Sequence, residues 1–126
     1  MEKLKDVPEI SYKEFQKNGL MRVGLVITNV PPKKLYTTQH FVDSEKISNF
    51  LKTTYPIDFE NLRGYWSMQL FGKPRLVLGD GNTRALIALQ TGTHISITVM
   101  GQLPLGAQTI PLTKLYQTYV DLFQEF

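Results

Sequence analysis

The sequence predicts one α+β domain: a small mixed β-sheet flanked by short helices, with a further helix at the C-terminal end. Segments with the spacing of strands and of helices follow one another along the chain. The length of 126 residues suits a single hydrophobic core, so residues 1–126 are expected to form one domain. A composition of 42% hydrophobic and 20% charged residues is that of a globular protein and not of a disordered or coiled-coil chain.

A short helix and then a strand are expected first. Ser11 and Glu14 have the spacing of a capping box, which predicts a helix ending near Gly19. Residues 23–27 are rich in branched side chains, which favour extended backbone. They predict a strand that stops at Pro31, because proline interrupts strand pairing.

A second short helix and a β-hairpin are expected next. The helix begins at the N-cap residue Ser44 and ends before Tyr55. Its apolar residues lie three and four apart, as on one helix face: Ile47, Phe50, Leu51. Strand-forming runs at residues 65–71 and 76–78 flank the turn residues 72–74, which predicts a hairpin.

The last third of the chain contains a short helix, a strand and a long helix. The short helix stops at Gly92, and residues 95–100 alternate as in a strand with one buried face. A loop over residues 101–106 leads to the longest predicted helix, over residues 112–126. Its apolar stripe indicates either a core face or a homodimer contact. The stripe consists of Leu112, Leu115, Tyr116, Tyr119, Val120, Phe123 and Phe126.

Composition excludes several kinds of chemistry. The chain has no cysteine, which excludes thiol nucleophiles, disulfides and thiolate zinc sites. Neither His40 nor His94 has a metal-ligand spacing, so both are interpreted as surface or structural residues and no metal site is predicted. No apolar segment approaches the roughly 20 residues that cross a bilayer, and the first residues lack a secretory pattern. A cytoplasmic location without a membrane partner is expected.

The segment with the clearest chemical character is residues 79–84, between the second hairpin strand and the short helix. Backbone N–H groups and the positive end of a helix dipole meet there, and both attract anions. Gly79 and Gly81 let the backbone approach a ligand closely, and Arg84 can close on a phosphate with its planar guanidinium. The sequence therefore predicts a phosphate-binding turn.

Three neighbours complete this turn. Asn82 or Thr83 is expected to cap the helix, and Asp80 to lie at the rim. The alternative is a plain tight turn with an exposed Arg84. The segment matches neither a Walker loop nor a dinucleotide fingerprint, because the Gly-Lys-Ser/Thr ending and a third glycine are absent.

The spacing of this turn resembles a known family. Gly81 is followed at the third position by Arg84 and at the eleventh by Gly92, as in the ParB-like and sulfiredoxin-like superfamily. A second patch, residues 32–39 followed by residues 45–47, looks like that family's early strand-to-helix passage. The two patches together span about residues 23 to 100.

The resemblance implies a mixed sheet flanked by helices, with a phosphate or nucleotide site at the glycine-arginine turn. Arg84 would contact phosphate with help from the backbone amides, and Gln39 and His40 would approach across one cleft. Catalysis, if present, would be nucleotide or phosphodiester hydrolysis by Asp80 and Arg84, with Mg²⁺ offsetting the phosphate charge.

The chain also departs from that family. Relatives that repair oxidised thiols carry cysteine at the position of Asn82, and many ParB-like sequences carry acidic or basic groups at Asn82 and Thr83. The neutral pair lacks those acid or base groups. Too few residues follow Gly101 to form the helix-turn-helix domain of chromosome-partitioning members.

Two other functions remain open. The fold could serve as an interaction module that associates through its C-terminal helix, or the basic loops could bind nucleic acid without sequence preference. The basic loop residues are Lys33, Lys34, Lys73 and Arg75. Tyr65 and Trp66 would stack on a base if exposed, or fill the core if buried.

Overall fold

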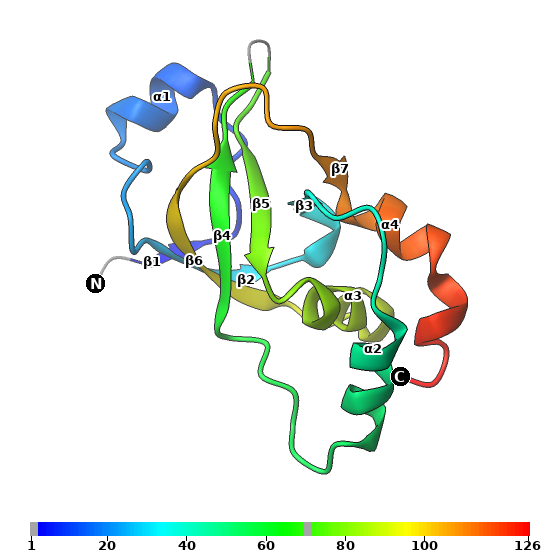
Figure 1. Cartoon of the computed structure of the whole chain (residues 1–126). Helices are drawn as coiled ribbons and strands as arrows, with labels where there is room; N and C mark the ends of the chain where they lie inside the picture. Colours follow the sequence, from blue (N-terminus) through cyan, green and yellow to red (C-terminus); the bar gives the residue numbers. More distant parts are fainter. Residues whose placement is uncertain (1–2, 70–71) are drawn as a thin grey trace.

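A computed structural model describes residues 3–69 and 72–126, and over these residues the chain forms one mixed sheet with helices around it (Figure 1). The strands are β1 (Lys3–Lys5), β2 (Val26–Val30), β3 (Tyr36–Thr37), β4 (Leu62–Ser67), β5 (Arg75–Asp80), β6 (Ile95–Gln102) and β7 (Ile110–Pro111). The helices are α1 (Tyr12–Lys17), α2 (Ser44–Lys52), α3 (Asn82–Thr91) and α4 (Leu112–Thr118), with 3-10 turns η1 (Pro32–Lys34) and η2 (Val120–Phe123).

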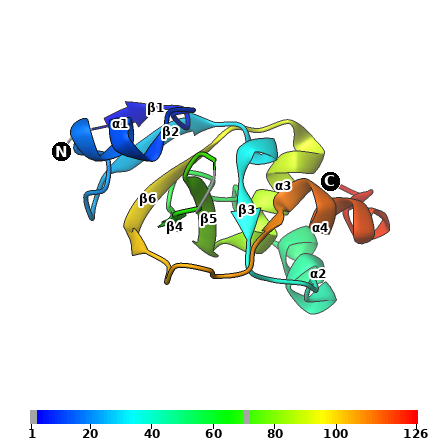
Figure 2. The ribbon, with the colours of Figure 1, turned by 90° about the horizontal axis from the view of Figure 1, so that it is seen from above.

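The strand order is β1-β2-β6-β4-β5-β3-β7. Strand β4 pairs with β5 in antiparallel fashion and with β6 in parallel, so the expected mixed sheet is confirmed. Figures 1 and 2 together show α2, α3 and α4 grouped at one end of the molecule and α1 at the other. None of the helices in the described ranges is long and apolar enough to span a bilayer.

Several helices and strands form where local sequence patterns predict them. The Ser11 side chain accepts a hydrogen bond from the Glu14 backbone N–H at 3.3 Å and caps α1. Gly92 ends α3 in the left-handed conformation at φ 68°. Strand β6 buries Ile95, Ile97 and Val99, as their alternation predicts.

The early strand and the cap of the second helix differ from the expectation. Strand β2 begins at Val26, because Gly24 leaves the extended conformation at φ 90°, and Val23 before it is 71% exposed. Helix α2 is capped by Asp43, whose carboxylate accepts from the Glu45 N–H at 3.0 Å, and Ser44 is its first helical residue. An ionised cap at a helix start is favoured by the helix dipole.

The hairpin is confirmed, with different strand bounds. Strand β4 begins earlier than expected, at Leu62, and ends at Ser67, with Trp66 opposite Leu76 in β5. Leu70 and Phe71, at the end of the predicted first strand, lie outside the described residues. The loop expected at residues 101–106 begins later, because β6 continues to Gln102.

The C-terminal helix is shorter than predicted. Helix α4 ends at Thr118, whose hydroxyl donates to the Lys114 carbonyl at 2.9 Å, and Tyr119 leaves the helical conformation at φ −119°. The longest of the described helices is therefore α3, and η2 turns Phe123 fully into the core. Most of the apolar stripe packs on the molecule's own core, and a homodimer contact stays a prediction.

Candidate functional site

A cleft of about 580 Å³ lies where β5 ends and α3 begins. Residues 79–84 form one wall, the loop before α2 contributes Gln39, Phe41 and Asp43, and α2 contributes Lys46, Asn49 and Phe50. Figure 1 shows the end of β5, the start of α3 and α2 at the same end of the sheet. The predicted phosphate-binding turn therefore lies in a cleft large enough for a small ligand.

Gly81 shapes the turn. It caps α3 in the left-handed conformation, with φ 90° and ψ 24°. A Cβ there would lie 2.8 Å from Leu62 Cγ and 3.1 Å from Arg84 Nη2, so both the backbone and the packing require glycine. The expected cap by Asn82 or Thr83 is wrong, because no side chain caps α3 and both residues lie within the helix.

The start of α3 offers backbone donors. The Ala85 N–H donates to the Gly81 carbonyl at 2.9 Å, which is the first hydrogen bond of the α3 ladder. The amides of Asn82, Thr83 and Arg84 precede that ladder and lie at the positive end of the helix dipole. The three residues that carry these amides line the cleft, and a helix start stabilises a negatively charged group.

Asn82 joins this turn to β3. Its side chain is 7% exposed, and the Thr37 hydroxyl donates to Asn82 Oδ1 at 2.7 Å. The same hydroxyl accepts from the Gln39 N–H at 3.0 Å, so its single proton is directed to Asn82. The side-chain carbonyl of Asn82 is thus engaged with Thr37 and joins the start of α3 to β3 beside the cleft.

The two residues expected opposite the turn behave differently. Gln39 lines the cleft, on the loop anchored by Thr37. His40 is exposed and is not among the residues that line it. The two predicted partners are neighbours in sequence, but the structure brings only Gln39 to the cleft.

Arg84 is held at the corner and lines the cleft. Its side chain is 19% exposed, and Nη1 donates to the Asp58 carbonyl at 3.0 Å. Nη2 lies 3.9 Å from Asp80 Oδ2, an ion pair longer than a hydrogen bond, and the Asp80 side chain is 65% exposed. Because a guanidinium carries five N–H donors, these contacts leave donors for an anion.

Asp58 supports Arg84 and was missed by the sequence reasoning. Its carboxylate accepts from the Glu60 N–H at 2.8 Å and from the Asn61 side-chain amide at 2.7 Å. These two hydrogen bonds, with the nearby Arg84 charge, hold the pKa of Asp58 below its ordinary value. The Asp-x-Glu-Asn order signals a local turn, but nothing local signals that the Asp58 carbonyl meets Arg84.

Helix α2 adds a second cation to the cleft. Lys46, Asn49 and Phe50 are spaced three and four residues apart, so they share one helix face, and all three line the cleft. The exposed ring of Phe41 lies just before this helix and lines the same cleft. The spacing on α2 is visible in the sequence, but the direction of that face depends on how α2 packs.

Gly79 and the hairpin residues Tyr65 and Trp66 take part in packing. A Cβ on Gly79 would lie 2.4 Å from Tyr65 Cε2, so the Tyr65 ring packs directly over this glycine. Trp66 is fully buried, with its indole N–H donating to the Leu20 carbonyl at 3.1 Å and its ring edge-to-face with Phe15. Burial of Trp66 is therefore confirmed, and it cannot stack on a base.

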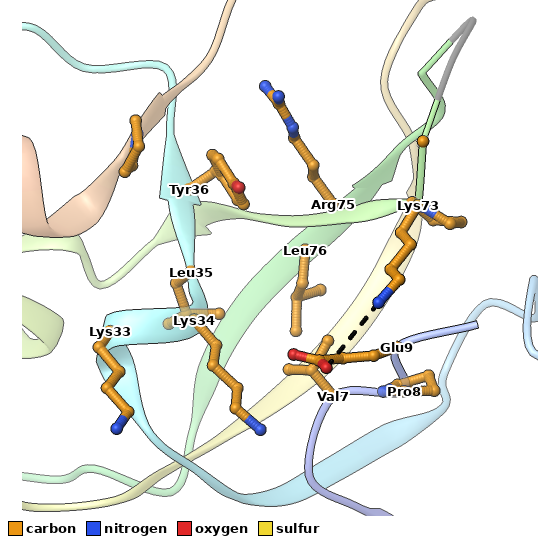
Figure 3. Close-up of a pocket in the computed structure, with 13 residues that line it drawn as sticks. Val7, Pro8, Glu9, Lys33, Lys34, Leu35, Tyr36, Lys73, Arg75 and Leu76 are labelled. Carbon is orange, nitrogen blue, oxygen red and sulfur yellow. Dashed lines mark ion pairs between the residues drawn. The ribbon is translucent and has the colours of Figure 1, made fainter. Parts of the chain in front are cut away.

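The basic loop residues line a second cavity of about 580 Å³, at the other end of β5 (Figure 3). Lys34 pairs with Asp6 at 2.8 Å, and Lys73 lies 3.9 Å from a Glu9 carboxylate oxygen. Arg75 lies over the Tyr36 ring at 4.5 Å and points away from the lysines in Figure 3. The carboxylates offset much of the lysine charge, and none of these basic residues lines the Arg84 cleft.

The histidines and acidic residues that the structure describes do not gather around a metal position. His94 Nδ1 lies 2.8 Å from Asn29 Oδ1, in a surface contact away from the cleft. Within residues 3–69 and 72–126, no three histidine, aspartate or glutamate side chains converge as a metal site would require.

The cleft thus combines a left-handed glycine, the start of a helix, the Arg84 guanidinium and Lys46 around one space. Each of these features favours an anionic group, whereas the carboxylates of Asp43 and Asp80, which also line the cleft, oppose one. Comparison with known proteins assigns no family: no family model, no curated protein and no solved structure matches the chain.

Proposed function

We propose that the protein binds a phosphate-bearing ligand, such as a nucleotide, in the cleft between the start of α3 and α2. The observation that carries this proposal is the position of Arg84, held over Gly81 by the Asp58 carbonyl while it lines the cleft. A guanidinium fixed in this way loses little conformational entropy when it binds phosphate.

The resemblance to the ParB-like and sulfiredoxin-like superfamily is part of the same proposal. Its support is the arrangement of three features: a strand that ends at the glycine turn, a helix that follows Arg84, and Gln39 on the opposite wall. The neutral Asn82 is consistent with a binding role, because its side chain is engaged with Thr37 and offers no acid or base.

We propose that Mg²⁺ binds together with the phosphates of the ligand. Asp80 and Asp43 line the cleft, and Mg²⁺ commonly binds through one or two carboxylates together with phosphate oxygens. Asp80 fits this role because its carboxylate is largely exposed and lies beyond hydrogen-bond distance from Arg84. The ion would neutralise phosphate charge, and hydrolysis of the ligand stays a prediction.

A thermal-shift screen tests the proposal. Nucleotides and inorganic phosphates are added with and without Mg²⁺ to the unmutated protein and to Arg84→Ala. A ligand at 100 times its Kd is expected to add about 2.7 kcal/mol of stability to the unmutated protein. Loss of a charged hydrogen bond in Arg84→Ala is expected to weaken binding by about 10- to 150-fold.

Arg22→Ala is the matched control. Arg22 also donates a guanidinium hydrogen bond to a backbone carbonyl, that of Gly19 at 2.8 Å, but it does not line the cleft. Its variant is expected to keep the ligand response. Equal stabilisation of Arg84→Ala and the unmutated protein, or no response to any phosphate compound, contradicts the proposal.

The remaining alternatives stay predictions. Nonspecific nucleic-acid binding would depend on the basic loops, whose lysines lie beside Asp6 and Glu9 in the second cavity. Such binding would weaken steeply as salt rises, whereas a ligand held in the cleft would change less.

A further inference from the structure

Phe41 is an apolar side chain left in solvent at the edge of the cleft. It is 72% exposed and lines the same space as Arg84 and Lys46. Its neighbour Val42 packs against the core, and Phe50 of α2 is also partly buried there. Single exposed apolar residues are common on protein surfaces, so the position of this ring matters more than its exposure.

The backbone on both sides of Phe41 is anchored. On one side the Gln39 N–H donates to Thr37 Oγ1 at 3.0 Å, and on the other the Asp43 carboxylate caps α2. The ring is therefore carried on a short segment between two fixed points. Because this backbone is already anchored, stacking of a flat group on the ring requires no further ordering of the main chain.

The cleft is larger than a phosphate group needs. Its volume of about 580 Å³ is that of a pocket for a small organic ligand. Arg84 and Lys46 supply positive charge, and Gln39 and Asn49 supply side-chain amides that can both donate and accept hydrogen bonds. A ring system with polar edges and an attached phosphate matches all of these groups.

We infer that the cleft takes a nucleotide, with its base stacked on Phe41 and its phosphates at Arg84 and Lys46. This inference rests on the proposed phosphate-binding function and adds the base. Stacking on an aromatic ring tolerates any base, because every base has a π-face. The amides of Gln39 and Asn49 are the cleft groups suited to contact a base edge and favour one base over another.

Calorimetric titration of the full chain tests this inference with Mg²⁺ present. The probes are pyrophosphate and the diphosphates ADP, GDP, CDP and UDP, which carry the same two phosphates with and without a nucleoside. At least one nucleoside diphosphate is expected to bind more tightly than pyrophosphate. Phe41→Ala is expected to weaken that nucleotide by about 5- to 150-fold and to leave pyrophosphate unchanged.

Two further variants complete the design. Phe41→Trp keeps a ring and is expected to retain nucleotide affinity. Tyr55→Ala removes an aromatic side chain that is 80% exposed and does not line the cleft, and its affinities are expected to stay unchanged. Because both positions are exposed, unchanged melting temperatures are expected to show that each variant is folded.

The outcomes separate this inference from the function on which it rests. If Phe41→Ala binds every nucleotide as the unmutated protein does while Arg84→Ala does not, the base platform is overturned and phosphate binding stands. The platform is also overturned if pyrophosphate binds as tightly as all four nucleotides. If none of the probes binds, both the inference and the proposed function fail.

Discussion

At the residue scale, the cleft depends on one buried hydroxyl group. Thr37 is fully buried and links two chain segments, by donating to Asn82 Oδ1 at 2.7 Å and accepting from the Gln39 N–H at 3.0 Å. A buried polar group without a partner is costly, so each of the three groups depends on the other two. The Asn82 side chain, expected as a possible helix cap, instead fixes the position of the wall through Thr37.

Thr37→Val tests this link. Valine has nearly the same shape but leaves Asn82 Oδ1 and the Gln39 N–H without their partner. The free energy of unfolding, measured by urea denaturation, is expected to fall by about 1 to 3 kcal/mol. Thr38→Val makes the same change at an exposed neighbour and is expected to stay within about 0.5 kcal/mol. Equal effects at both positions would argue against the link.

At the scale of elements, α3 lies between two left-handed glycines with different surroundings. A methyl group added to Gly81, before the helix, would lie within 3.1 Å of Leu62 and Arg84 side-chain atoms. A methyl group added to Gly92, after the helix, would have nothing within 4 Å. The left-handed backbone favours glycine at both positions, but only at Gly81 does close packing also exclude a side chain. Substitutions at the two ends of α3 therefore measure the cost of backbone strain separately from the cost of steric overlap.

Alanine at each glycine measures the two effects. Gly92→Ala is expected to cost about 1 to 2 kcal/mol of unfolding free energy, for an L-residue in the left-handed conformation. Gly81→Ala is expected to cost about 1 to 3 kcal/mol more, because Leu62 must move. Since Arg84 must move as well, ligand affinity is expected to fall only in Gly81→Ala. Urea denaturation and calorimetry check both, and equal costs would refute the packing argument.

The elements recovered from the sequence are those with local signals. The cap at Ser11, the stop at Gly92 and the alternation over β6 each depend on neighbouring residues, and all three were confirmed. The sequence reasoning missed β1, β3 and β7, which are two or three residues long. Such strands are too short to show a period and exist because distant partners pair with them, as Val77 does with Tyr36.

The residues of the candidate site also fall into two groups, those that a local sequence pattern predicts and those that reach the cleft through distant packing. The glycine-arginine spacing located the turn, because the turn and the helix start are contiguous in sequence. Asp58, Lys46 and Phe41 were missed because they reach the cleft through packing of a loop and of α2. The expected cap by Asn82 was wrong because its hydrogen bond is with Thr37 of β3, a strand that was not predicted.

At the scale of the whole molecule, the C-terminal segment closes the core. Leu112, Leu115 and Phe123 are buried, and the Phe123 ring lies 5.8 Å from that of Tyr116. Leu122, beside Phe123 in η2, is 37% exposed. The break at Tyr119 thus directs one aromatic residue inward and leaves its neighbour at the surface.

Substitutions in η2 distinguish a core role from an interface role. Phe123→Ala is expected to lower the free energy of unfolding by about 3 to 5 kcal/mol, and Phe123→Leu by less than about 1.5 kcal/mol, because leucine fills most of the space. Leu122→Ala serves as the half-exposed control, with a smaller expected loss than Phe123→Ala. Denaturation midpoints are expected to be independent of protein concentration. A midpoint that rises with concentration would instead indicate a dimer through this segment.

The pairing of β3 bears on when the cleft can form during synthesis of the chain. This strand of two residues is held between β5 and β7, with Thr37 opposite both Leu78 and Ile110. A growing chain that has emerged from the ribosome as far as Arg84 contains every residue of the cleft, but the outer partner of β3 has not yet emerged. The proposed ligand site is therefore expected to be complete only after β6 and β7 have both emerged.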